Sequence, residues 1–148
     1  RPKVPNFTPE NVPFEIGKAW KVSEGTDVSI FATGHLLWKA VEAQGILADK
    51  GFSAEIINIH TIKPLDVDAI IASVNKTGCA VTAEEHQRNG GLGDSVAQTL
   101  GMHLPSPLEM VAVDDSFGES GTPEQLLEKY GLNAESIVNA ALKAIARK

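Results

Sequence analysis

The hydrophobic residues of this 148-residue chain follow two kinds of pattern that alternate along the sequence. Short, mostly apolar runs have the length and composition of strands that are buried on both faces. Longer stretches repeat apolar residues every three or four positions, as amphipathic helices do. The expected strands are residues 28–32, 54–59, 79–82 and 108–113, and the expected helices between them are 36–50, 65–75 and 94–103. Strands joined by such helices predict parallel pairing through right-handed crossovers.

Capping signals mark where several of these helices begin and end. Asp66 precedes an apolar helix face and is expected as its N-cap, and Gly51 follows the first helix as a stop signal. Residues 122–125, TPEQ, have the form of a capping box with proline at the first helical position. Asn133 is expected to cap a last helix whose apolar side chains share one face, namely Ile137, Ala141, Ala144 and Ile145.

The first part of the chain predicts a linker and one further strand. Four prolines in residues 1–14 indicate an extended linker. Residues 14–22 have the pattern of a strand with Phe14 and Ile16 pointing inward, and the turn at 24–27 is too short for a crossover. This strand should therefore run antiparallel to the next one, without having to be its neighbour. The expected fold is one three-layer α/β/α domain on a five-stranded, mostly parallel mixed sheet with one antiparallel strand.

Composition and charge narrow the class of protein. The net charge is −6 and the basic residues are scattered, which argues against a nucleic-acid binder. No apolar run approaches the roughly 20 residues of a membrane span, and the proline-rich start does not resemble a signal peptide. Cys79, the single cysteine, lies in an apolar run and is expected in the core. A chain without disulfides fits a reducing compartment, so we expect a cytoplasmic protein. The sequence starts with Arg1 and not with methionine, so we expect a processed chain or a piece of a longer one.

The candidate site lies in the stretch EEHQRNGGLGD, residues 84–94, where a strand gives way to a helix. Ligands of open α/β sheets bind beyond the carboxyl ends of the strands, and the loops 33–35 and 60–64 reach the same edge. Adjacent strand residues point to opposite faces, so Glu84 and Glu85 should separate, and one of them can accept hydrogen bonds from the glycine-loop amides. The candidate anion or interface site consists of Gly34, His35, Glu84, Glu85, His86, Gly90, Gly91 and Gly93.

Other kinds of site find less support in the sequence. The first parallel strand is followed by TGHLLW, which lacks the G-x-G-x-x-G of a dinucleotide site, and no G-x-S-x-G is present. The four histidines have no i,i+3 or i,i+4 spacing, so no metal site is expected, although His35 and His86 can meet at the sheet edge. A phosphate on the helix after Gly93 is physically possible. Asp94, as a negatively charged N-cap, would oppose that phosphate.

Four segments in order resemble the C-terminal domain of transketolase: DVSIFATG, AVEAQGILADKGFSAEIINIHTIKPLD, VTAEEHQRNGGLGDSV and FGESGTPEQLLEKYGL. Runs like TIKPLD also occur in 1-deoxyxylulose-5-phosphate synthase and in the β subunit of 2-oxoacid dehydrogenases. His86 after the glutamates, together with the tail SGTPEQLLEKYGL, favours transketolase, although the synthase has a related tail. The opening resembles the junction from a pyrimidine-binding domain. Residues 1–13 are thus expected to be the linker from that domain, and residues 14–148 to be the C-terminal domain.

The resemblance implies a sheet whose antiparallel first strand lies at an edge. It also implies a thiamine-diphosphate enzyme that moves a two-carbon ketol unit between sugar phosphates, with its cofactor between two other domains across a dimer interface. In the family a G-D-G...N segment holds the diphosphate and magnesium, whereas residues 91–94 here are GLGD. No catalytic, cofactor-binding or metal residue can therefore be carried over. The matching positions are Thr61, Lys63, Pro64, Leu65, Asp66, Glu84, Glu85, His86, Gly90, Gly91 and Gly93.

The resulting hypothesis is a non-catalytic structural and assembly domain of a cytoplasmic, homodimeric transketolase of the pentose phosphate pathway. Its partners would be the N-terminal and pyrimidine-binding domains, and alone it would be inactive and bind neither thiamine diphosphate nor magnesium. The surface facing the absent domain should be an exposed apolar patch, for which Trp20 and Trp38 are candidates. The rival families above remain alternatives. An alternative of another class is a stand-alone anion- or sugar-phosphate-binding module that uses His35, His86 and the Gly90–Gly93 amides.

Overall fold

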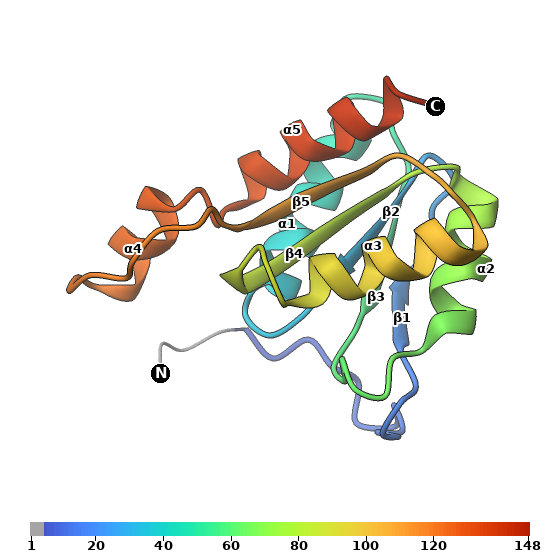
Figure 1. Ribbon diagram of the computed structural model, residues 1–148, viewed down its shortest axis with the longest axis horizontal. Coiled ribbons are helices and arrows are strands. Elements are labelled where there is room, and N and C mark those ends of the chain that lie inside the picture. Colours follow the sequence, from blue (N-terminus) through green and yellow to red (C-terminus); the bar gives the residue numbers. More distant parts are fainter. Residues whose placement is uncertain (1–4) are drawn as a thin grey trace.

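The computed structural model describes residues 5–148, which form one five-stranded sheet with helices packed on both faces and one short helix, α4, beyond its end (Figure 1). The strands are β1 (Trp20–Ser23), β2 (Val28–Ala32), β3 (Ala54–Asn58), β4 (Ala80–Gln87) and β5 (Leu108–Val113). The helices are α1 (Leu36–Asp49), α2 (Val67–Thr77), α3 (Leu92–His103), α4 (Pro123–Lys129) and α5 (Ala134–Ile145). The strand order is β1-β3-β2-β4-β5, with β1 antiparallel to β3 at one edge and the other pairs parallel. The expected fold class is confirmed.

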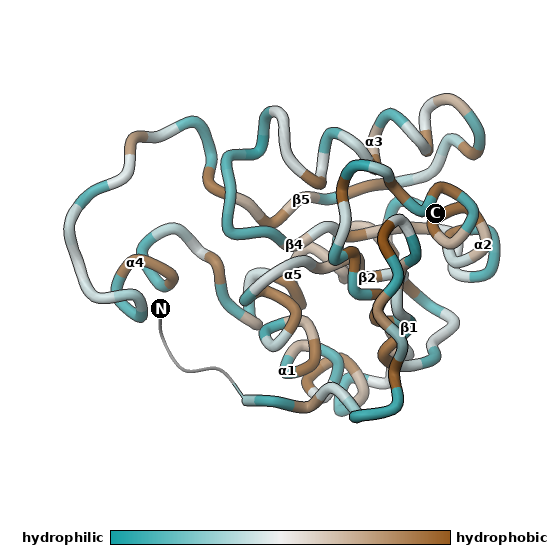
Figure 2. The backbone as a smooth tube through the Cα atoms, turned by 90° about the horizontal axis from the view of Figure 1, so that it is seen from below, coloured by the Kyte–Doolittle hydropathy of each residue, from teal (hydrophilic) through white to brown (hydrophobic). Residues whose placement is uncertain are grey.

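Two hydrophobic layers hold helices against the sheet, and β2 lies between them. Its residues alternate, so that Val28, Ile30 and Ala32 pack toward α1 and α5, whereas Phe31 packs toward α2 and α3. All five residues of this strand are buried, which explains why its sequence is almost continuously apolar. Figure 2 shows the hydrophobic segments concentrated in the strands and in the helix faces next to them. None of the helices in the described part of the chain is long and apolar enough to cross a membrane.

The predicted strand at residues 14–22 is wrong in its first half. The paired strand begins only at Trp20, and Phe14 and Ile16 are 70% and 68% exposed instead of pointing inward. The backbone of this segment is held by side chains of the loop before α2, not by a strand partner. The Gly17 amide donates to Thr61 Oγ1 (2.9 Å), and the Ala19 amide donates to Asp66 Oδ2 (2.8 Å).

The junction between β4 and α3 also differs from the prediction. The strand continues through the polar residues 84–87, and the helix begins at Leu92, earlier than predicted. Asp94 is therefore not the N-cap, which is Gly91. The Asp94 carboxylate instead accepts a hydrogen bond from the Gly90 amide (2.6 Å), so it closes the turn before the helix.

The other capping predictions are confirmed. The Asp66 side chain accepts from the Ala69 amide, Asn133 accepts from the Ser136 amide, and Thr122 forms the capping box with Gln125. Cys79 is buried in the core, as expected, and its thiol donates to the Asp27 carbonyl. Burial raises the pKa of this thiol.

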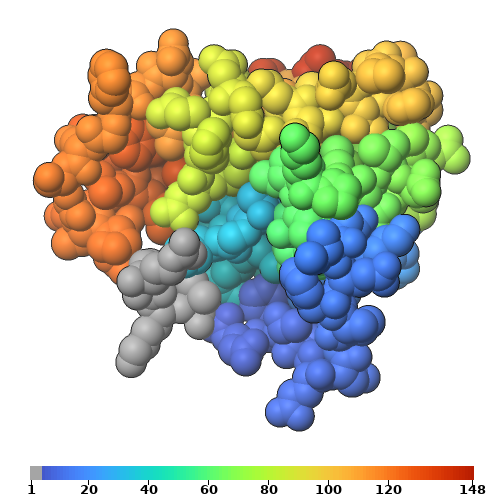
Figure 3. All heavy atoms as spheres, turned by 60° about the horizontal axis from the view of Figure 1, so that its bottom comes forward, coloured from blue at the N-terminus to red at the C-terminus, as the bar shows by residue number. Residues whose placement is uncertain are grey.

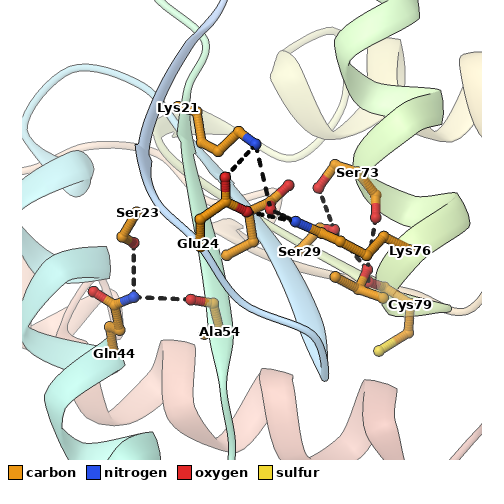
Figure 4. A network of polar contacts seen from close by, with 11 residues as sticks. Lys21, Ser23, Glu24, Ser29, Gln44, Ala54, Ser73, Lys76 and Cys79 are labelled. Carbon is orange, nitrogen blue, oxygen red and sulfur yellow. Dashed lines mark hydrogen bonds and ion pairs between the residues drawn. The ribbon is translucent and has the colours of Figure 1, made fainter.

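A polar network closes the amino ends of the strands, opposite the candidate site (Figure 4). The buried Ser29 hydroxyl bonds to Ser73 Oγ at 2.5 Å and to Thr77 Oγ1 at 2.6 Å, which ties β2 to α2. Lys76 pairs with buried Glu55 and with exposed Glu24. Hydrogen bonds from Lys21 and then Lys76 lower the pKa of Glu24 to about 2. These contacts fasten the edge strand and α2 to the centre of the sheet.

Candidate functional site

The carboxyl edge of the sheet contains a pocket of about 260 Å³ between the ends of β2 and β4. Strand β2 is followed by α1 on one face of the sheet and β4 by α3 on the other, so the pocket lies where the chain switches sides. Figure 3 shows this face, with a hollow bordered by the segments near residues 35, 62 and 86. The pocket is lined by Thr33, Gly34, His35, Ile62, Glu84, Glu85, His86, Gly90 and Gly91. Seven of the eight predicted site residues therefore gather here, and Gly93 lies buried in the first turn of α3.

Glu84 is a buried carboxylate that holds the start of α3. It is 1% exposed and accepts hydrogen bonds from the Leu92 amide (2.7 Å) and the Gly93 amide (2.8 Å). These are unpaired donors of the first helical turn, where a negative charge is also favoured by the helix dipole. A Cβ on Gly91 would lie 2.1 Å from Glu84 Oε2, which explains the glycine at this position. The prediction that one glutamate binds the glycine-loop amides is confirmed.

The occupied amides decide what the glycine loop can bind. Glu84 takes the donors of Leu92 and Gly93, and Asp94 takes the amide of Gly90. A phosphate at this helix start would have to displace a buried carboxylate and approach a second one. The chain's own carboxylate therefore stands where an external anion would bind.

Glu85 points away from Glu84, as the strand geometry predicts, and its side chain is 53% exposed. Its carboxylate lies 3.5 Å from Nδ1 of His35. His86 lines the same pocket, with its Nδ1 2.8 Å from the carbonyl oxygen of Gln87. Among the described residues that line the pocket there is no lysine or arginine, and the carboxylate that is not bound to helix amides is Glu85, beside His35. The pocket is therefore better suited to a basic or hydrogen-bond-donating group than to an anion.

Two stretches supply features that sequence reasoning missed: residues 14–19, here called the incoming segment, and the loop 60–66, which holds it. The ring of Phe14 lies against that of His60 in a tilted arrangement, with centroids 4.6 Å apart, and exposed Ile62 of the same loop lines the pocket. Gly17 lies against Pro64 so closely that an added Cβ would be 2.9 Å from its ring. These contacts join residues more than 40 positions apart and leave no periodic signal in the sequence.

Trp20 and Trp38 do not form the exposed apolar patch that was expected of them. Both are half-buried, and Phe7 lies between them with ring-centroid distances of 6.4 Å and 5.7 Å. The exposed large hydrophobic side chains are instead Phe14, Ile16, Ile46, Ile62, Met102 and Phe117. Three of them, Phe14, Ile16 and Ile62, belong to the incoming segment and the loop that holds it.

Comparison with known proteins assigns the fold to a family. The sequence model of the transketolase C-terminal domain matches residues 17–137. The chain belongs to the transketolase C-terminal domain family. It is 47% identical over 139 residues to the 6-deoxy-6-sulfo-D-fructose transketolase subunit SqwH of Clostridium sp. (strain MSTE9), covering 94% of this chain and 43% of the relative.

A second relative and a solved structure are also similar to this chain. It is 40% identical over 123 residues to 1-deoxy-D-xylulose-5-phosphate synthase of Syntrophotalea carbinolica (strain DSM 2380 / NBRC 103641 / GraBd1), covering 82% of this chain and 19% of the relative. The solved structure "Split gene transketolase, inactive beta4 tetramer" superposes with a TM-score of 0.94 at 43% identity, covering 98% of this chain and 48% of that chain. The chain thus spans less than half the length of these relatives.

The cofactor chemistry of transketolases does not fit the residues of this domain. A diphosphate needs free amides or cations, and the helix-start amides here already bind Glu84. Within residues 5–148 no group of three or more His, Cys, Asp or Glu side chains is arranged to hold a metal ion.

Proposed function

We propose that this chain is the non-catalytic structural and assembly domain of a transketolase-type enzyme whose cofactor and substrate sites lie in its other domains. The observation that carries the proposal is the Glu84 carboxylate, which occupies the amides at the start of α3, where a phosphate could otherwise bind. The share of its relatives that the chain spans, 43% of the Clostridium subunit, supports the same proposal.

The whole enzyme, in this proposal, transfers a two-carbon ketol unit with thiamine diphosphate and magnesium bound by the N-terminal and pyrimidine-binding domains. The Clostridium relative is named for 6-deoxy-6-sulfo-D-fructose, so we propose a ketose with a terminal anionic group as the substrate class. A sugar phosphate of the pentose phosphate pathway and a sulfonated sugar both meet this description. A cytoplasmic enzyme assembled as a homodimer remains part of the proposal.

The apolar side chains of the incoming segment mark where the preceding domain would dock. Phe14 and Ile16 are 70% and 68% exposed, and Ile62 beside them is 38% exposed. Their backbone is nevertheless fixed, because Thr61 and Asp66 hold the amides of Gly17 and Ala19. An ordered apolar surface next to the chain's path from the preceding domain is suited to a permanent contact.

A reconstitution assay tests this function. The purified chain should show no ketol transfer from either a sugar phosphate or 6-deoxy-6-sulfofructose, whereas the complete enzyme should show it. Phe14→Ser should weaken assembly without unfolding the domain. Ile46→Ser, which changes an exposed side chain of α1, is the control and should leave assembly unchanged. Ketol transfer by the chain alone would contradict the proposal. Saturable binding of inorganic phosphate that is lost in His86→Ala would favour the anion-binding module instead.

A further inference from the structure

A well-held arm projects from the carboxyl edge beside the candidate site. It comprises residues 114–130, the loop after β5 and the short helix α4, and it extends past the end of the sheet (Figure 1). Helix α4 buries none of its residues fully. Leu127 and Tyr130 pack against the main core, but residues 114–122 do not, so the ordered shape of that loop needs another explanation.

Specific contacts fix the arm while leaving its aromatic side chain in water. Gln87 Nε2 donates to the Ser116 carbonyl (2.7 Å), and the Tyr130 hydroxyl donates to the Phe117 carbonyl (3.0 Å). Lys129 pairs with Glu119. Phe117, between these attachment points, is 99% exposed. Aromatic side chains presented on an ordered backbone are typical anchors of protein interfaces, because ordering them costs little when the partner binds.

The space under the arm adds an apolar recess to this anchor. A pocket of about 300 Å³ lies between the end of β5 and α4, and it is lined mostly by apolar side chains. Its lining includes Val113, Leu126, Leu127 and Tyr130, together with Glu85 of the candidate site. The arm and the carboxyl-edge pocket thus form adjoining parts of one face.

The charge of the arm indicates what kind of surface it can meet. Residues 114–128 contain five carboxylates and no lysine or arginine. Arg88 pairs with Asp114, and Lys129 pairs with Glu119, which leaves Asp115, Glu124 and Glu128 without a cationic partner in the described structure. Two copies of this arm would repel each other, whereas a surface rich in lysine and arginine would be attracted.

We propose that the arm docks the domain onto a basic surface of the remaining part of the enzyme, with Phe117 entering an apolar pocket that lysines and arginines surround. This inference rests on the proposed function, since it names a contact through which that assembly forms. The partner surface would be basic around an apolar centre. It is distinct from the contact proposed for residues 14–16, whose segment (blue) lies on another side of this face from the arm (orange) in Figure 3.

Hydroxyl-radical footprinting of the unmodified protein tests the contact. The oxidation rate of Phe117 is measured in the chain alone and in the assembled enzyme, with exposed Met102 in α3 as the internal control. We expect assembly to protect Phe117 by about 10-fold or more and to leave Met102 unchanged, because a buried interface anchor loses most of its contact with water.

Two variants separate the apolar contribution to docking of the arm from the electrostatic contribution. Phe117→Ala should weaken assembly by about 30-fold, as an interface anchor does, whereas Met102→Ala should have no effect. Asp115→Asn should reduce the dependence of assembly on salt, since it removes an arm charge at a left-handed backbone position (φ 42°) that asparagine tolerates.

The possible outcomes distinguish this inference from the proposed function. If the chain assembles with the rest of the enzyme while Phe117 stays fully reactive, the docking inference is wrong and the proposed function stands. If the chain does not associate with the rest of the enzyme at all, both are wrong. If Phe117 becomes protected in the chain alone as its concentration rises, the arm docks to a second copy. That result would contradict docking onto a basic surface of the rest of the enzyme.

Discussion

Replacing Glu84 tests the interpretation of the carboxyl-edge site as a filled anion position. In Glu84→Gln the side chain keeps its size but loses its charge and one acceptor oxygen. One helix amide can then bond to the remaining oxygen, while the other faces the NH₂ group and stays unpaired. Glu85→Gln is the matched control, because it makes the same chemical change one position later on a side chain that is 53% exposed.

The expected loss of stability follows from the two hydrogen bonds. A hydrogen bond to a charged group contributes about 1.5–3 kcal/mol, and a buried donor left unpaired costs about 1–3 kcal/mol. With Glu84 1% exposed, Glu84→Gln should therefore lower the free energy of unfolding by about 2–4 kcal/mol. Glu84→Ala, which leaves both the Leu92 and Gly93 amides unpaired, should cost about 3–6 kcal/mol. Glu85→Gln should stay within about 0.5 kcal/mol.

Urea denaturation followed by far-UV circular dichroism measures these differences. The midpoint should shift while the m value stays constant, because the surface exposed on unfolding does not change. In thermal unfolding, a loss of about 3 kcal/mol corresponds to a decrease of roughly 6–12 °C for a domain of this size. Equal stabilities of Glu84→Gln and Glu85→Gln would refute the reasoning.

Four further predictions follow from named contacts. Gly91→Ala should destabilise the domain by about 2 kcal/mol or more in the same urea assay, because its Cβ collides with Glu84. Cys79 should react with Ellman's reagent only after unfolding, since it is buried and its pKa is raised. Ser29→Ala should cost about 1–3 kcal/mol by leaving a buried hydroxyl unpaired, as calorimetry can measure. The pKa of Glu24 is lowered from 4.5 to about 2, so its stabilisation is present above pH 4.5 and disappears as the pH falls toward 2. The difference in free energy of unfolding between the wild type and Glu24→Gln should therefore fall toward zero as the pH is lowered from 4.5 to 2.

The central strands and the helices could be predicted from sequence because their signals are local. Residues 28–32 are apolar throughout, and the cap residues Asp66, Thr122 and Asn133 stand at the helix starts where their side chains bond. Residues 14–19 could not be predicted, because their backbone is held by side chains of a loop more than 40 positions away. A sequence pattern carries no record of such a contact.

The sequence could predict which residues form the candidate site, but not what each of them binds. The convergence of loops at the carboxyl edge follows from the topology, so the grouping of His35 with Glu85 and His86 was within reach. The strand was expected to end at residue 82, and a carboxylate inside a sheet is costly unless it is paired. Glu84 is paired, but with amides of the following helix. Phe117 gave no signal, because a single phenylalanine in a polar loop can equally fold back onto the core.

The most direct test of the central claim is a calorimetric titration of the purified chain with thiamine diphosphate in the presence of magnesium, with the complete enzyme as the positive control. Our account predicts saturable heat for the complete enzyme and none for the chain alone, because Glu84 and Asp94 already hold the helix-start amides. Saturable cofactor binding by the chain alone would contradict the assignment of this domain to assembly and would place part of the chemistry within it.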